Sequence, residues 1–314
     1  MKQRTLKKSI YTEGIGLHTG SKVKLYLHPA ACNSGIVFVR KDIDNSPLIK
    51  ACIENVLPPE EVPRRTSLCG PGGVTIHTIE HLMAAFSGMM LDNIFVEVEG
   101  EEIPGLDGSG RKFLELIKEA GIEEQQEVKN FLVIREPLFV NSDNTFIACF
   151  PYRGLKIDYL LDYAHPLLKD QFVETEINPE VFEKEIASAR TFCLEEEVDS
   201  LRNLGLGRGA NYNNTLVVTR EGVVNNEVYF DNEFARHKLL DLLGDLYLIG
   251  PLQAHIIAIR SGHKTNIHFV EKLQRYKEEI TKSGIQAKFS IEETAILDIK
   301  EIMEILPHRY PFLF

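Results

Sequence analysis

Apolar and polar residues alternate along much of the first 30 positions, on either side of a glycine-bearing turn at residues 14–20. This period of two predicts paired strands. Further along, residues 79–86 and the segment RKFLELIKEAGI have the composition and spacing of helices, with glycine stops at Gly88 and Gly121. We expect Thr78 to cap the first of these helices. Short strands are also predicted at residues 36–39 and 51–56.

The second half of the chain again shows strands followed by helices, although no repeat of roughly 20–50 residues is visible. Strands are predicted in FLVIREPLFV, TFIACFPY and LKIDYLLDYAHP. Helices are predicted at residues 178–187, 233–245 and 267–284, with a strand in AHIIAIRSGHKTN before the last of them. A polar, charge-rich segment, EEQQEV, precedes this half, and we place a domain boundary there, near residue 127.

Composition narrows the function classes. The chain has 314 residues, 44% of them hydrophobic, and a formal net charge of -11, with no dominant basic stripe, so nucleic acid is not an expected partner. Its most apolar stretch is too short and interrupted to span a bilayer, and no signal peptide is visible. The five cysteines are scattered without a CxxC pair, which is typical of reduced thiols. We expect a cytoplasmic protein.

The segment at residues 233–245, EFARHKLLDLLGD, carries the first candidate chemistry. His237 and Asp241 are four residues apart, so on a helix they lie on one face and could bind the same cation. Asp245, one turn further, could orient a neighbouring group. Most HxxxD sequences are instead the solvated faces of amphipathic helices, so this pair needs a third ligand from elsewhere.

The segment TIHTIEHLMAAF offers that ligand in His81, with Glu80 beside it. Two histidines and one carboxylate with an open position form a recurrent catalytic zinc site, and the same set binds iron in non-haem oxygenases. Glu80 as a base and His263, in a glycine-flanked turn, as an acid favour metal-dependent hydrolysis. A non-haem iron enzyme, and a binding protein with a structural metal, remain open at this point.

Six collinear motifs carry a resemblance to a known family: TLKKSIYTEGIGLHTG, RRTSLCGPGGVTIHTIEHLMAAFSGMMLDN, IPGLDGSG, ASARTF, FARHKLLDLLGD and SGHKTN. Together they resemble the zinc-dependent UDP-3-O-acyl-N-acetylglucosamine deacetylases of lipid A biosynthesis. The resemblance implies that zinc, or Fe2+ in the cell, is bound by His81, His237 and Asp241. It implies that Glu80 is the general base.

The resemblance also implies the roles of further residues. His263, held by Asp245, would stabilise the oxyanion and protonate the leaving amine, and Thr191 would donate a hydrogen bond to that oxyanion. Substrate contacts are expected at five positions: Lys238, Phe192, Tyr163, Arg260 and His18. An insert at about 193–225, with a glycine-rich stretch at residues 201–211, would form the passage for the acyl chain.

The fold implied by the resemblance is α+β, with two similar layered sheet-plus-helices domains, 1–127 and 128–290, and the active site between them. Residues 291–314 are expected to be a linker and the first residues of a second module, because LDIKEIMEILPHRYPFLF resembles the beginning of a (3R)-hydroxyacyl-[acyl-carrier-protein] dehydratase, a hot-dog-type module. We therefore expect the deacetylase part of a bifunctional protein, with UDP-3-O-acyl-N-acetylglucosamine as substrate. Acyl-carrier protein would be a partner of the second module, whose catalytic histidine motif is absent here.

Overall fold

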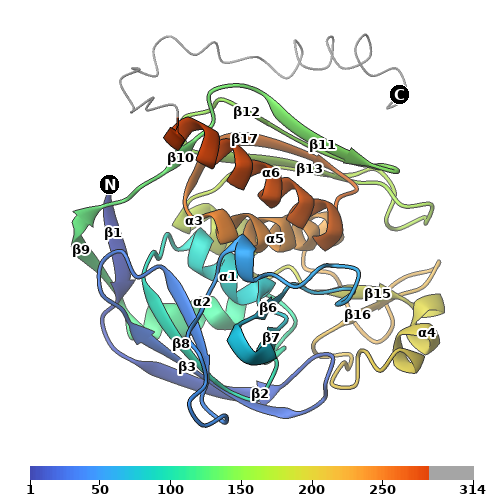
Figure 1. Ribbon diagram of the computed structural model, residues 1–314. Helices are drawn as coiled ribbons and strands as arrows, with labels where there is room; N and C mark the ends of the chain where they lie inside the picture. The colour runs from blue at the N-terminus through green and yellow to red at the C-terminus, as the bar shows by residue number, and fades with distance from the viewer. Residues whose placement is uncertain (283–314) are drawn as a thin grey trace.

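The structure, a computed structural model, describes residues 1–282 (Figure 1). The segment 291–314, with its predicted dehydratase resemblance, and the end of the last predicted helix lie outside these residues. Two main sheets enclose a layer of helices, as Figure 1 shows. The helices of this layer are α1 (Glu80–Gly88), α2 (Arg111–Ala120) and α5 (Glu233–Leu246).

The first main sheet contains five strands in the order β2-β3-β8-β4-β5. Their bounds are β2 (Ile10–Ile15), β3 (Lys22–Pro29), β8 (Ile94–Glu99), β4 (Ile36–Arg40) and β5 (Ile49–Lys50). The pairing of β4 with β8 is parallel, and the other pairings are antiparallel. Alternate residues of β3 and β8 are buried, as expected for a sheet that packs one face on helices.

The second main sheet follows the path β11-β12-β17-β13-β14, with β10 added beside β17. The bounds are β10 (Leu132–Val133), β11 (Leu138–Ser142), β12 (Thr145–Phe150), β17 (Leu252–Ile259), β13 (Leu155–Leu161) and β14 (Gln171–Glu176). Here β13 and β17 are parallel, and the other pairs on this path are antiparallel. The last helix, α6 (His263–Lys282), follows β17 and contacts α5, β11 and β12.

The two main sheets have the same topology. Numbered within each half, the strands of both paths lie in the order 1-2-5-3-4, with the parallel pairing at the same step. In each half a helix precedes the fifth strand, α1 or α5, and another follows it, α2 or α6. The ligand-bearing segments at residues 80–81 and 237–241 therefore occupy equivalent helices of the two halves.

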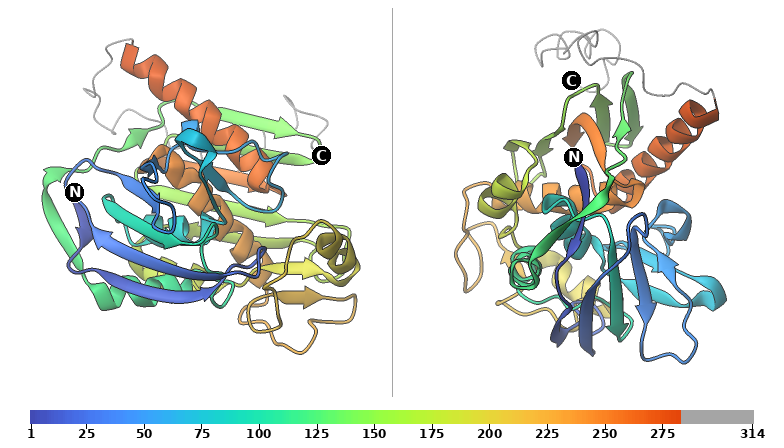
Figure 2. Two further views of the ribbon diagram at one scale, coloured as in Figure 1. Left: turned by 60° about the horizontal axis from the view of Figure 1, so that its bottom comes forward. Right: turned by 90° about the vertical axis from the view of Figure 1, so that its left-hand side faces the viewer.

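Smaller elements complete the described chain. The pairs β1 (Lys2–Leu6) with β9 (Ile122–Val128), β6 (Ser67–Cys69) with β7 (Thr75–His77), and β15 (Phe192–Leu194) with β16 (Leu216–Val218) form two-stranded sheets. Short helical elements are η1 (Ile53–Asn55), η2 (Pro71–Gly73), α3 (Pro179–Val181), η3 (Phe182–Ile186), η4 (Glu195–Glu197), α4 (Val198–Asn203) and η5 (Tyr247–Ile249). The segment from β15 through α4 to β16 projects from one side of the molecule (Figure 2).

Several predicted boundaries were wrong. The polar segment EEQQEV is not a link but part of β9, which pairs with the first strand of the chain. The strand predicted at residues 51–56 is η1, preceded by the short β5. Thr78 does not cap α1, since it has a left-handed φ of 59° and Ile79 occupies the cap position. The last helix begins at His263, four residues earlier than predicted.

The close approach of α1 and α5 lies at the centre of one hydrophobic core that runs through both halves. Twelve of the 14 residues of α5 are buried, so its polar residues do not form a solvated helix face. A Cβ added to Gly244 would lie 2.1 Å from the carbonyl oxygen of Glu80, so only glycine fits there. Within residues 1–282, no helix is both long and apolar enough to cross a membrane.

This packing predicts the effect of a methyl group at the contact. Gly244→Ala should force α1 and α5 apart and lower the free energy of unfolding by about 3 kcal/mol or more. The methyl group would meet backbone atoms of Glu80, which cannot move aside by changing a side-chain rotamer. Denaturant unfolding of the purified protein measures this. Gly222→Ala is the matched control, since a Cβ there meets nothing within 4 Å. Equal midpoints for the two variants would contradict the packing argument.

Candidate functional site

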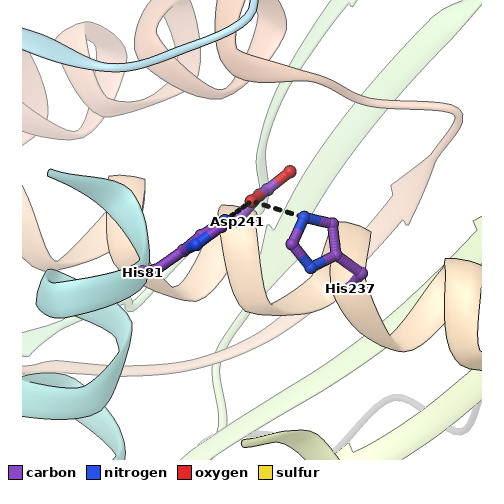
Figure 3. A group of neighbouring side chains, drawn as sticks. All are labelled: His81, His237 and Asp241. Atoms are coloured by element: carbon purple, nitrogen blue, oxygen red, sulfur yellow. Dashed lines mark ion pairs between the residues drawn. The ribbon is translucent and has the colours of Figure 1, made fainter. Parts of the chain in front are cut away.

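Three side chains from the two central helices converge at one point (Figure 3). His81 is the second residue of α1, and His237 and Asp241 lie one turn apart on α5. Their candidate ligand atoms all lie within 4.8 Å of one another. The Nε2 atoms of His81 and His237 are 3.4 and 3.5 Å from Oδ1 of Asp241. The predicted ligand trio is therefore brought together, from opposite halves of the chain.

The trio fits a metal ion. Oδ1 of Asp241 is buried and has no hydrogen-bond partner among the described residues, although both imidazoles point toward it. A buried carboxylate oxygen without a partner is costly unless a cation completes its surroundings. Nδ1 of His237 lies 3.1 Å from the carbonyl oxygen of Ala189, a bond that turns Nε2 toward the other ligands.

The charge states of the trio also suit a divalent cation. Burial lowers the pKa of His237 to about 3, so its imidazole is neutral and has a free lone pair. Burial opposes ionisation of Asp241, but the positive charges of Lys238 and His263 outweigh it and hold its pKa well below the usual range. Nζ of Lys238 donates to Oδ2 of Asp241 at 2.6 Å. The trio therefore contains a neutral imidazole at His237 and a carboxylate anion at Asp241.

Glu80 and His263, the predicted base and acid, face the same space beside the trio. Oε1 of Glu80 lies 4.0 Å from Nε2 of His263, which is 3.7 Å from Oδ2 of Asp241. The other Glu80 oxygen accepts the backbone N–H of Thr66 at 3.0 Å. Burial raises the pKa of Glu80, and this makes its carboxylate a stronger base.

Asp245 orients His263 through the ring nitrogen that faces away from Glu80 and Asp241. Its Nδ1 lies 2.9 Å from Oδ2 of Asp245, which also accepts from the side-chain amide of Asn266 at 2.8 Å. Burial alone lowers the pKa of His263, but the charges of Asp245 and Asp241 outweigh it and raise the pKa to about 9. The imidazole is therefore cationic at neutral pH, with its Nε2–H directed toward Glu80 and Asp241.

The ARTF segment contains two predicted site residues, Thr191 and Phe192, and Phe192 lies next to His237. The ring of Phe192 has its centroid 6.2 Å from that of His237 and 5.0 Å from that of Phe234, so it borders the ligand trio. Thr191 is half-buried, and its backbone N–H donates to the carbonyl of Gly108 at 2.8 Å. It stands two residues after Ala189, whose carbonyl bonds to His237.

Tyr163 and Arg260 lie near the ends of β13 and β17. Tyr163 packs against the core. Burial lowers the pKa of Lys238, but the negative charge of Asp241, with a smaller contribution from Tyr163, outweighs burial and raises this pKa. The Arg260 guanidinium is partly exposed and lies 3.8 Å from the carboxylate of Asp162. Within residues 1–282, no hydrogen bond or ion pair joins Arg260 to the ligand trio.

His18 joins the two glycine-rich segments of the chain. Its Nδ1 accepts the backbone N–H of Gly207 at 3.3 Å, and its carbonyl accepts the N–H of Arg208 at 3.2 Å. Its own N–H donates to the buried carboxylate of Glu102. Burial lowers the pKa of the His18 imidazole to about 4, so the ring is neutral. The glycine-rich part of the insert thus packs against the turn at residues 14–20.

The site contains residues to which the sequence assigned no role. Thr66 contacts Glu80, Asp245 and His263, and stands inside the quoted RRTS motif. Arg190, in the ARTF motif, forms a buried ion pair with Glu233 at 2.8 Å. Glu233 precedes His237 by one turn of α5, so this pair ties the ARTF segment to the ligand helix. The contact of the Ala189 carbonyl with His237 could not be predicted from the sequence, because every residue has a backbone carbonyl.

Comparison with known proteins places the chain in a family. Residues 3–275 match the family described as LpxC, UDP-3-O-acyl N-acetylglycosamine deacetylase. The chain belongs to this family. A deacetylase by that name from Syntrophus aciditrophicus is 38% identical over 89% of this chain and 88% of its own length. Another from Acidithiobacillus ferrooxidans is 39% identical, with 94% and 98% covered.

A third relative has two activities in its name. The bifunctional enzyme LpxC/FabZ of Chlorobaculum tepidum is 40% identical to this LpxC-family chain. The match covers 99% of the chain and 72% of the relative. The family-defining region ends at residue 275, close to the end of α6 at Lys282, so the described fold corresponds to the LpxC part.

Proposed function

We propose that this LpxC-family chain hydrolyses the N-acetyl group of UDP-3-O-acyl-N-acetylglucosamine, releasing acetate, with zinc bound by His81, His237 and Asp241. One observation supports this above the others: a buried glutamate and a cationic histidine flank the ligand trio, in which Oδ1 of Asp241 has no hydrogen-bond partner within residues 1–282. A structural metal would need neither group. The same ligands suit Fe2+, which we expect as an alternative metal in the cell.

In the proposed mechanism His81, His237 and Asp241 would hold the zinc ion, which would supply Lewis-acid activation of water and of the acetamide carbonyl. Glu80 accepts a proton from the attacking water at its carboxylate, whose basicity burial increases. His263 stabilises the negative charge that develops on the carbonyl oxygen and then donates its Nε2 proton to the leaving amine. Asp245 keeps this imidazole oriented, and the Thr191 hydroxyl donates a further hydrogen bond to the oxyanion.

The remaining predicted residues would bind the substrate. Lys238, a cation already next to Asp241, would contact the sugar or the diphosphate. Phe192 would lie along the acyl group, which the insert at about 193–225 would enclose. Tyr163 would stack on uracil and Arg260 would contact the diphosphate. His18 would line the substrate site beside the glycine-rich segment that it contacts through Gly207.

The domain organisation of the whole protein is also a proposal. The common topology of the two sheets supports residues 1–127 and 128–290 as two related domains around the site. The two-activity name of the Chlorobaculum relative supports a second, dehydratase module after residue 291, with acyl-carrier protein as its partner. A cytoplasmic location remains a prediction from the sequence.

The proposed reaction predicts metal-dependent release of acetate. Purified protein should release acetate from UDP-3-O-acyl-N-acetylglucosamine, lose this activity on treatment with a chelator, and regain it when zinc is added back. Acetate can be quantified enzymatically or by NMR spectroscopy. Binding of the substrate without acetate release under any metal would contradict the proposed function and favour a UDP-sugar binding protein.

The assigned roles predict that two neighbouring residues differ in metal binding. Glu80→Gln should retain zinc and lower kcat by about 100-fold or more, because the amide keeps the hydrogen bond from Thr66 but is no base. His81→Ala should lose both zinc and turnover, because it removes a ligand. Metal content by mass spectrometry and steady-state kinetics separate the two. A near-native kcat for Glu80→Gln would disprove its role as the base.

A further inference from the structure

Thr66 makes contacts to both proposed acid–base groups. It is 2% exposed and stands directly before β6. Its backbone N–H donates to Oε2 of Glu80 at 3.0 Å, and its hydroxyl donates to Oδ1 of Asp245 at 2.5 Å. Glu80 belongs to the first half of the chain, and Asp245 belongs to the second. One residue thus contacts the base and the carboxylate that orients the acid.

The hydroxyl of Thr66 completes the surroundings of Asp245. This carboxylate is entirely buried, and its Oδ2 already accepts from Nδ1 of His263 and from Asn266. The Thr66 hydroxyl has one proton, which serves Oδ1. Its oxygen also lies 3.2 Å from Nδ1 of His263. Loss of this donor would leave Oδ1 unsatisfied and free the carboxylate to rotate away from the imidazole.

The backbone of Thr66 is anchored to the start of α1. Its carbonyl accepts the N–H of Ile79 at 3.2 Å, in addition to the bond from its own N–H to Glu80. The peptide groups of Thr66 are therefore fixed relative to the base, while the side chain is bonded to groups on α5 and α6. Movement of His263 relative to Glu80, 4.0 Å away, would break one of these bonds.

We propose that Thr66 is a positioning residue, which fixes the Asp245–His263 pair relative to Glu80 through its hydroxyl. The expected effect of Thr66 on kcat rests on the proposed deacetylase function. The expected effect of Thr66 on the hydrogen bond between His263 and Asp245 does not. The positioning role requires the hydroxyl group of Thr66, so valine, which has the same shape but no hydroxyl, should not replace it. Thr5 provides the comparison: it is also buried, and its hydroxyl donates to the carbonyl of Asn93 at 2.6 Å, in a contact without proposed site residues.

The kinetic test compares Thr66→Val, Thr66→Ser and Thr5→Val in the zinc-loaded protein. Thr66→Val should lower kcat by about 10- to 100-fold with KM changed less than about threefold, because it removes one buried donor and no substrate contact. Thr66→Ser should restore kcat to within about threefold of the wild type, and Thr5→Val should leave kcat unchanged. If the valine variant does not fold, Thr66→Ala serves the same comparison.

A second readout does not depend on activity. In metal-free protein with labelled histidine, NMR spectroscopy can detect the Nδ1–H proton of His263 in its hydrogen bond to Asp245. This signal should shift or broaden in Thr66→Val, return in Thr66→Ser and remain unchanged in Thr5→Val. An unchanged signal in Thr66→Val, or a kcat within about twofold of the wild type, would overturn the inference.

The two proposals can fail separately. If wild-type protein releases no acetate, the proposed function fails, and the NMR comparison alone decides whether the Thr66 hydroxyl positions His263. If the wild type is active and Thr66→Val loses zinc instead of turnover per zinc, the residue acts on the metal site and the inference is wrong. Zinc content is therefore measured for each variant.

Discussion

The site depends on the close approach of two buried helices. Gly244 of α5 lies against the carbonyl of Glu80 in α1, at a separation that no side chain would permit. This contact places His81, the next residue of α1, opposite His237 and Asp241. Because α1 and α5 are equivalent helices of two halves with the same topology, the ligand set is shared between them. Neither half contains the three ligands by itself.

A cation would balance the charge that this packing buries. Three carboxylates, Glu80, Asp241 and Asp245, lie in one buried cluster with the cations of Lys238 and His263. Burying a charge is costly unless it is paired, and Oδ1 of Asp241 has no hydrogen-bond partner among residues 1–282. A divalent ion at that oxygen would compensate the remaining negative charge. The same surroundings give Glu80 its basicity and keep His263 protonated.

Sequence reasoning succeeded where spacing alone determines geometry. His237 and Asp241 share a helix face because they are four residues apart, and α5 confirms it. Sequence reasoning failed where contacts between distant segments determine the local structure. The polar segment EEQQEV becomes β9 because β1 pairs with it, and a preference for loops could not reveal that partner. Thr66 acts through a backbone N–H and a hydroxyl whose partners are distant in sequence, so its contacts were not predictable.

The most direct test of the account is the X-ray absorption spectrum of the zinc-loaded protein at the zinc K edge. The account predicts one zinc per chain with two imidazole nitrogens and oxygen donors at about 2.0–2.2 Å, including water at an open position. The absence of bound zinc, and hence of a zinc edge, in His81→Ala would assign one ligand to α1. A sulfur shell at about 2.3 Å, or four protein ligands without water, would contradict a catalytic metal held between the two halves.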